Sequence, residues 1–140
     1  MSFRPILELR FFAVPENLKM ARDEIAGAIG RVGCSEEVGR SVVVAVNEAC
    51  MNIIQHGYRG DPAGEIVLEI LNDGEQLLVE LRDSARTADP QKVCPRKLED
   101  LRPGGLGTHF IQEIMDDFTM CAGPGGKGNV WRMTKTIERD

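Results

Sequence analysis

The pattern of apolar and charged positions predicts a strand and then a helix at the start of the chain. Between Ile6 and Val14 apolar residues are separated by charged ones such as Glu8 and Arg10. A period of two is typical of a strand with one buried face. Apolar residues then recur at helical spacing from Leu18 to Val32, and Gly33 ends that pattern.

A second helix is expected from Ser35 to about His56. Ser35 is a good helix cap, and Glu36 and Glu37 give the acidic first turn that favours a helix start. Gly57 ends the pattern. At 100° per residue, one stripe of this helix is apolar and predicts its core face. That stripe consists of Val42, Val46, Ala49 and Ile53.

The rest of the chain predicts four more strands and one more helix. The strands are expected at 65–71, 76–82, 119–122 and 129–137, and the helix at 106–118. Residues 84–105 carry three prolines and no periodicity, so we expect a long loop, and loops of this length are commonly functional lids. The order predicts one α/β domain over residues 1–140, a two-layer sandwich with a mainly antiparallel mixed sheet and helices on one face.

Composition narrows the class of protein. The chain has 140 residues, a formal charge of −5 and no run of Lys and Arg, which argues against binding nucleic acid or anionic lipid. Proteins and small ligands are the expected partners. Without a long apolar run or a signal-like N-terminus, the protein is expected in the cytoplasm and not in a membrane. The four cysteines are far apart and are expected as free thiols; they are Cys34, Cys50, Cys94 and Cys121.

Three polar residues of the second helix form one line at the border of its core face. Glu48, Asn52 and His56 are spaced four residues apart, so they lie above one another. An Asn oxygen suits magnesium, and a Glu can orient or deprotonate a hydroxyl group. A solvated edge of an amphipathic helix has the same pattern, so the helix alone does not decide between the two interpretations.

Glycines precede the third helix and supply a candidate phosphate site. Flexible backbone amides and a helix N-terminus together bind phosphate, although a hinge has the same composition. The candidate residues are Gly104, Gly105, Leu106, Gly107 and Thr108. Gly123, Gly125 and Gly128 satisfy G-x-G-x-x-G, but a strand pattern follows where a dinucleotide site needs a helix, so we interpret them as a turn. The chain contains no P-loop motif.

Asp83 ends the strand expected before the long loop. A carboxylate at this place can accept a hydrogen bond from the exocyclic amine of a base and orient it in an apolar pocket. Ordinary turn chemistry explains an Asp at a strand end equally well.

These signals, taken in order, resemble the N, G1 and G2 boxes of the ATPase family that includes gyrase, histidine kinases and MutL. They are Glu48-Ala49-x-x-Asn52-x-x-x-His56-Gly57-Tyr58, then Asp83, then Arg102-Pro103-Gly104-Gly105-Leu106-Gly107. Within that family the chain is most similar to the small anti-sigma factor serine kinases of the RsbW type. The similarity extends from the opening strand to the closing residues GNVWRMTKTI, and so covers nearly the whole chain.

The resemblance implies a Bergerat-type fold that binds ATP and Mg²⁺. It implies that Asn52, in the box that also contains His56, helps to hold the metal, that Glu48 is the general base toward a serine hydroxyl, and that Asp83 recognises adenine. The amides of Gly105 to Gly107 would line the phosphates. Candidates for contacting the terminal phosphate are Lys92, Arg96, Lys97 and Arg102.

The chain departs from the family at Ala85, which replaces the glycine of the D-x-G motif in the adenine loop. If that turn requires a positive φ, a β-carbon costs about 1 kcal/mol or more.

The resemblance implies a homodimer, with the first strand and first helix as the expected interface, and an anti-sigma factor kinase. Such a kinase binds a sigma factor or an analogous regulator and phosphorylates a serine or threonine of an anti-sigma-factor antagonist. The alternative is a partner-binding module with weak or absent kinase activity. A histidine kinase is disfavoured because no helix offers a free phosphoacceptor histidine.

Overall fold

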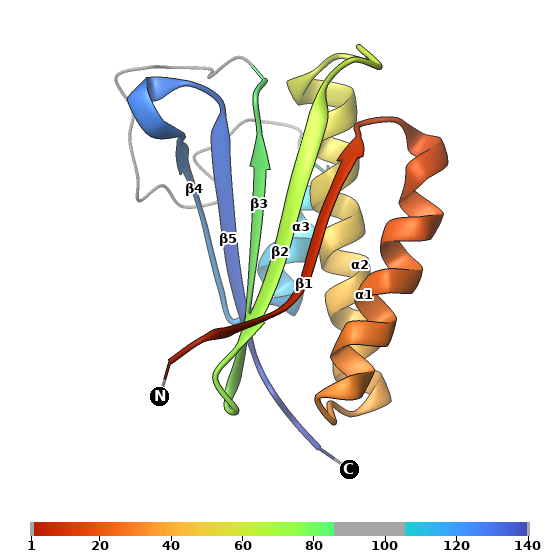
Figure 1. Cartoon of the computed structure of the whole chain (residues 1–140), viewed down its shortest axis with the longest axis vertical. Coiled ribbons are helices and arrows are strands. Elements are labelled where there is room, and N and C mark those ends of the chain that lie inside the picture. Colours follow the sequence, from red (N-terminus) through yellow and green to blue (C-terminus); the bar gives the residue numbers. More distant parts are fainter. Residues whose placement is uncertain (1, 86–105, 140) are drawn as a thin grey trace.

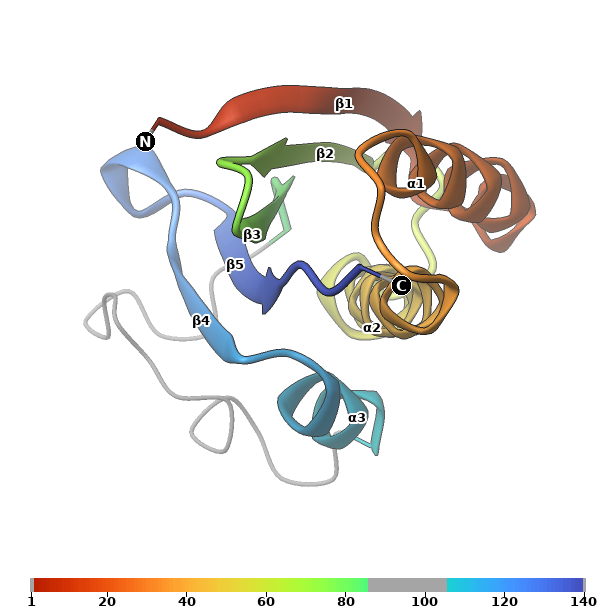
Figure 2. The same cartoon turned by 90° about the horizontal axis from the view of Figure 1, so that it is seen from below.

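Five strands form one sheet in the order β1-β2-β3-β5-β4, and all four neighbouring pairs are antiparallel. The computed structural model describes residues 2–85 and 106–139 (Figure 1). The strands are β1 (Arg4–Phe12), β2 (Glu65–Asn72), β3 (Gln76–Asp83), β4 (Asp117–Ala122) and β5 (Asn129–Thr136). The sheet curves around the helices, which all lie on one side of it (Figure 2). The expected two-layer α/β sandwich is therefore confirmed.

Two long helices connect β1 to β2. A short 3-10 turn, η1 (Pro15–Asn17), leads into α1 (Leu18–Arg31), and α2 (Glu36–Asn52) is followed by a π-helix, η2 (Ile53–Gly57). The Ser35 hydroxyl accepts a hydrogen bond from the Val38 amide at 3.2 Å, which makes it the expected N-cap of α2. The third helix, α3 (Leu106–Ile114), packs beside α2.

The core lies between the sheet and the helices. The apolar stripe of α2 is buried as its periodicity predicted, with Val42, Val46, Ala49 and Ile53 at most 1% exposed. Opposite it lie alternate residues of the central strands, which are equally buried: Ile66, Leu68, Ile70, Leu77, Val79 and Leu81. We call this side of the sheet the helix face.

Register places four residues of β3 and β5 on the helix face at one end of the sheet. Asp83 pairs with Ile66 of β2 and with Asn129 of β5. Leu81 pairs with Trp131. Directly opposed residues of antiparallel strands share a face, so Asp83, Asn129 and Trp131 all face the helix layer.

The third helix is shorter than its apolar spacing predicted. It ends at Ile114 instead of 118, and Phe118 belongs to β4, where its ring stacks on Trp131 with centroids 5.6 Å apart. The cause is a set of bonds around Asp116. Its amide donates to the Thr134 carbonyl at 2.9 Å, and its carboxylate accepts from the Thr136 amide at 2.6 Å. These bonds direct the chain into the sheet.

The cysteine expectation is wrong at one position. Cys121 is disulfide-bonded, although the wide spacing of cysteines along the chain predicted free thiols. Spacing along a chain does not determine distance in space, which is why the prediction failed. Cys34 and Cys50 are free, and burial raises the pKa of the Cys50 thiol to about 12. Cys94 and the expected lid residues 86–105 lie outside the described residues.

In the part of the chain that the structure describes, no helix is long and apolar enough to cross a membrane.

The start of β5 depends on a glycine that lies against the end of β3. Gly128 has φ +68°, and a β-carbon there would overlap the Asp83 carbonyl oxygen. Gly125 of the same turn has φ +70°, yet a β-carbon there would meet nothing within 4 Å. Both glycines therefore have the left-handed backbone that favours glycine, but only Gly125 has room for a β-carbon.

We predict that Gly128→Ala lowers the free energy of unfolding by about 2–4 kcal/mol, because left-handed strain and overlap with β3 add together. Gly125→Ala, the matched control, carries the strain alone and costs about 1 kcal/mol. Urea unfolding of both variants measures the difference. Equal losses would show that the approach to Asp83 is not tight.

Candidate nucleotide-binding site

A π-helix begins immediately after Asn52. The Tyr58 amide donates to the Ile53 carbonyl at 2.8 Å, a bond that spans five residues. Single π turns occur frequently at functional sites. The wider turn redirects the side chains beyond Asn52, and His56 is exposed. The line expected through Glu48, Asn52 and His56 therefore has α-helical spacing only for its first two members.

Glu48 and Asn52 lie one turn apart near the end of α2. The Asn52 Nδ2 donates to the Glu48 backbone carbonyl at 3.0 Å. This bond uses the amino end of the amide and leaves the Oδ1 oxygen as the end suited to a ligand. The Asn52 residue is 8% exposed, whereas Glu48 is half-buried. A neutral oxygen in this position fits Mg²⁺. This ion is commonly coordinated by one or two protein ligands, and substrate phosphates and water complete its coordination shell.

Three donors hold the buried carboxylate of Asp83. Its Oδ1 accepts from the Asn129 Nδ2 and from the Ala85 amide, both at 2.9 Å. Its Oδ2 accepts from the Trp131 Nε1 at 3.1 Å. Burial raises the pKa of Asp83, and these hydrogen bonds oppose that rise. A carboxylate offers about four acceptor positions, and donors from the described residues fill two on Oδ1 and one on Oδ2.

Asn129 and Trp131 were not predicted as site residues. A signal was present in the sequence, because the two are separated by one residue in an expected strand and must share a face. Their common target, Asp83, could not be identified without the pairing of β3 with β5.

Tyr58 joins the end of the helix layer to the end of β3. Its hydroxyl donates to the Glu65 carbonyl at 2.6 Å and accepts from the Ser84 amide at 2.7 Å. A β-carbon on Gly57 would lie 3.2 Å from the Ala85 β-carbon, so these two residues are neighbours as well. The structure thus brings the segment after Asn52 together with the loop after Asp83.

Ala85 carries no left-handed strain. Among the described residues, Arg59 is the only residue other than glycine with a positive φ. The turn after Asp83 therefore accommodates a β-carbon without the cost that a positive φ would impose. Ala85 is 4% exposed, and its β-carbon lies beside Gly57.

The candidate phosphate residues fall partly outside the described chain. Gly104 and Gly105 lie outside it, whereas Leu106, Gly107 and Thr108 form the first turn of α3. Because α3 ends just before β4 starts at the opposite end of the sheet, its N-terminus points toward the end where Asp83 lies (Figure 1). A helix N-terminus at this place favours an anion.

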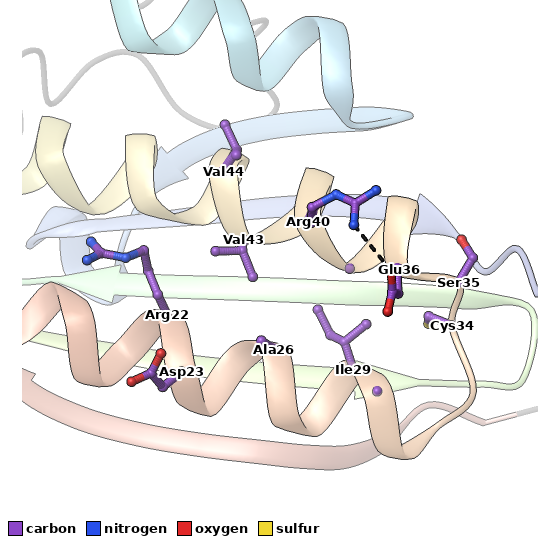
Figure 3. Close-up of a pocket in the computed structure, with 12 residues that line it drawn as sticks. Arg22, Asp23, Ala26, Ile29, Cys34, Ser35, Glu36, Arg40, Val43 and Val44 are labelled. Atoms are coloured by element: carbon purple, nitrogen blue, oxygen red, sulfur yellow. Dashed lines mark hydrogen bonds and ion pairs between the residues drawn. The ribbon is translucent and has the colours of Figure 1, made fainter.

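A separate groove of about 610 Å³ lies between α1 and α2 (Figure 3). Small and apolar residues such as Ala26, Gly30 and Val43 line it, and an ion pair between Glu36 and Arg40 at 3.5 Å borders it. None of the expected site residues lines this α1–α2 groove. The segment after Asn52 and the loop after Asp83 instead meet where η2 reaches the end of β3.

Comparison with known proteins identifies the family to which the chain belongs. Residues 11–135 match the family described as the histidine kinase-like ATPase domain. The chain is 32% identical over 119 residues to the serine-protein kinase RsbW of Listeria monocytogenes (serotype 4a, strain HCC23), covering 79% of this chain and 76% of that protein. It is 29% identical over 149 residues to the enzyme of that name from Bacillus pumilus (strain SAFR-032), covering 96% and 88%.

Among solved structures, the RsbU and RsbW domains of Rv1364c from Mycobacterium tuberculosis share the fold, with a TM-score of 0.70 at 16% identity. The alignment covers 97% of this chain and 32% of that one. The chain belongs to the histidine kinase-like ATPase family and, within it, is of the RsbW type.

Proposed function

We propose that this chain is an ATP-dependent serine/threonine kinase that acts as an anti-sigma factor by partner switching. The observation that carries the proposal is the contact between the segment after Asn52 and the loop after the buried Asp83 carboxylate, made by Tyr58 with Ser84 and by Gly57 with Ala85. The relatives named serine-protein kinase RsbW support the choice of kinase over other ATPases. In this proposal an anti-sigma-factor antagonist is the substrate and a sigma factor is the second partner.

Each residue has a separate task in the proposed reaction. Asp83 would accept a hydrogen bond from the exocyclic amine of adenine, and Asn52 Oδ1 would hold the Mg²⁺ that accompanies ATP. When bound, the metal neutralises charge on the phosphates. Backbone amides from Gly104 to Thr108 line the phosphates. The oxygen of the substrate hydroxyl bonds to the terminal phosphorus of ATP, and ADP leaves. Glu48 accepts the proton that this hydroxyl loses.

Structure weakens the argument for the alternative, a binding module without kinase activity. That alternative was motivated by Ala85, which was expected to strain the adenine loop. Ala85 has no positive φ, so backbone strain there does not support the alternative, whereas a narrower adenine pocket would still favour it. A phosphotransfer assay separates the two functions.

We propose further that the protein acts in the cytoplasm as a homodimer. Its β1 strand is at an edge of the sheet, where backbone donors and acceptors are open to pairing with another strand. Phe12 at the end of β1 is 55% exposed, and Met20 in α1 is 41% exposed. These features support an interface that uses the first strand and first helix.

Asn52→Ala is predicted to remove the magnesium dependence of ATP binding. With Mg²⁺ present the affinity should fall at least about tenfold, or about 1.4 kcal/mol, because the metal loses its protein oxygen. Calorimetry with and without Mg²⁺ measures both quantities.

The matched control is Asn47→Ala on the same helix, where the amide oxygen accepts from Arg22 at 3.0 Å. This control should bind Mg-ATP like the native chain. Retention of magnesium-dependent affinity by Asn52→Ala would contradict the assignment of the metal ligand.

Glu48→Gln is predicted to slow phosphate transfer to a purified antagonist by about 10²–10⁴-fold, the range of a general base. ATP affinity should be unchanged, because the variant keeps shape and loses only the proton acceptor. Radiolabelled phosphate incorporation at saturating Mg-ATP measures the rate. Glu37→Gln, in the first turn of the same helix, should transfer phosphate at the native rate. Full activity of Glu48→Gln would exclude this residue as the base.

A further inference from the structure

Trp131 is the single tryptophan of the chain, and its indole ring is held in two ways. It lies on the helix face of β5 with 5% exposure, opposite Leu81 of β3 and Met120 of β4. Its ring stacks on Phe118, with an angle of 18° between the planes. Its N–H donates to Asp83 Oδ2 at 3.1 Å. Packing and hydrogen bonding together fix the direction of this donor.

The donor of Trp131 reaches the carboxylate oxygen that has room for a ligand. Oδ1 already accepts from two protein donors, Asn129 Nδ2 and the Ala85 amide. Among the described residues, Oδ2 accepts a hydrogen bond from Trp131 alone. The indole therefore determines which lone pair of Oδ2 stays open, and it holds the carboxylate against rotation.

We infer that Trp131 is a positioning residue that makes the site selective for purines with a 6-amino group. This inference rests on the proposed function, in which Asp83 faces adenine. An ionised carboxylate only accepts hydrogen bonds, so it favours an amine at position 6 and disfavours an oxygen there. Trp131 orients Oδ2 and, together with Asn129 and the Ala85 amide, favours the ionised form against the effect of burial, because a donor to a carboxylate stabilises its charge.

The selectivity follows from leaving a buried acceptor opposite another acceptor. Sites built around one hydrogen bond reject an analogue that cannot make it, since the buried polar group remains unpaired. Without the indole N–H, Asp83 keeps its two donors on Oδ1 but loses the one on Oδ2. Oδ2 is then less firmly held and binds a proton more readily, and a protonated carboxyl group donates to a 6-oxo purine. Loss of Trp131 should therefore reduce discrimination more than it reduces affinity for ATP.

The test compares ATP with inosine triphosphate, which carries an oxygen at position 6, by calorimetry in the presence of Mg²⁺. The native chain should prefer ATP by at least about tenfold, the effect of one hydrogen bond to a charged group. Trp131→Phe keeps an aromatic ring opposite Phe118 and loses the N–H, and it should lose most of that preference. Phe118→Leu is the matched control, because it removes the stacking and keeps the donor. It should retain the native ratio even if it unfolds more easily.

The inference would be overturned if Trp131→Phe kept the native preference for ATP over inosine triphosphate, or if both variants lost that preference equally. Either result would leave ATP binding intact. A native chain that does not bind ATP would instead overturn the proposed function and this inference with it. The native fluorescence gives a measurement that needs no variant. Saturating ATP should change the emission of Trp131 more than saturating inosine triphosphate, and equal changes for the two nucleotides would overturn the inference.

Discussion

The buried carboxylate of Asp83 is the constraint on which the site depends. Burying a charge is costly unless hydrogen bonds compensate for the lost water. Here the compensation comes from the loop amide of Ala85 and from Asn129 and Trp131 of another strand. This arrangement requires β5 to begin directly beside the end of β3, which in turn requires the close approach at Gly128. The close approach at Gly128 therefore helps to set the surroundings of the Asp83 carboxylate.

Local patterns in the sequence predicted most of the fold, whereas contacts between distant segments were missed. The core stripe of α2 and the polar pair Glu48 and Asn52 follow from helical spacing alone. Trp131 was missed as a site residue because it contacts Asp83 across 48 positions, and no periodicity carries that information. Phe118 has the spacing of a helix but lies in a strand, since bonds from Asp116 to β5 outweigh local preference.

The arrangement of layers explains how a small domain can present a nucleotide site. The sheet supplies a rigid acceptor through Asp83, and α2 supplies a neutral oxygen through Asn52. The π-helix and Tyr58 bind the two layers together at this end, with hydrogen bonds to both Glu65 and Ser84. Groups on rigid elements hold their geometry better than groups on loops. The α1–α2 groove is separate from this end, and none of the candidate site residues lines it.

The most direct test of this account is to locate ATP on the chain. Backbone amide chemical shifts measured by NMR, during titration with Mg-ATP, report which segments the nucleotide contacts. The account predicts the largest changes within residues 52–58, 83–85 and 129–131, where η2, the loop after β3 and the start of β5 converge. Binding without changes in these segments, or with changes confined to the α1–α2 groove, would contradict it.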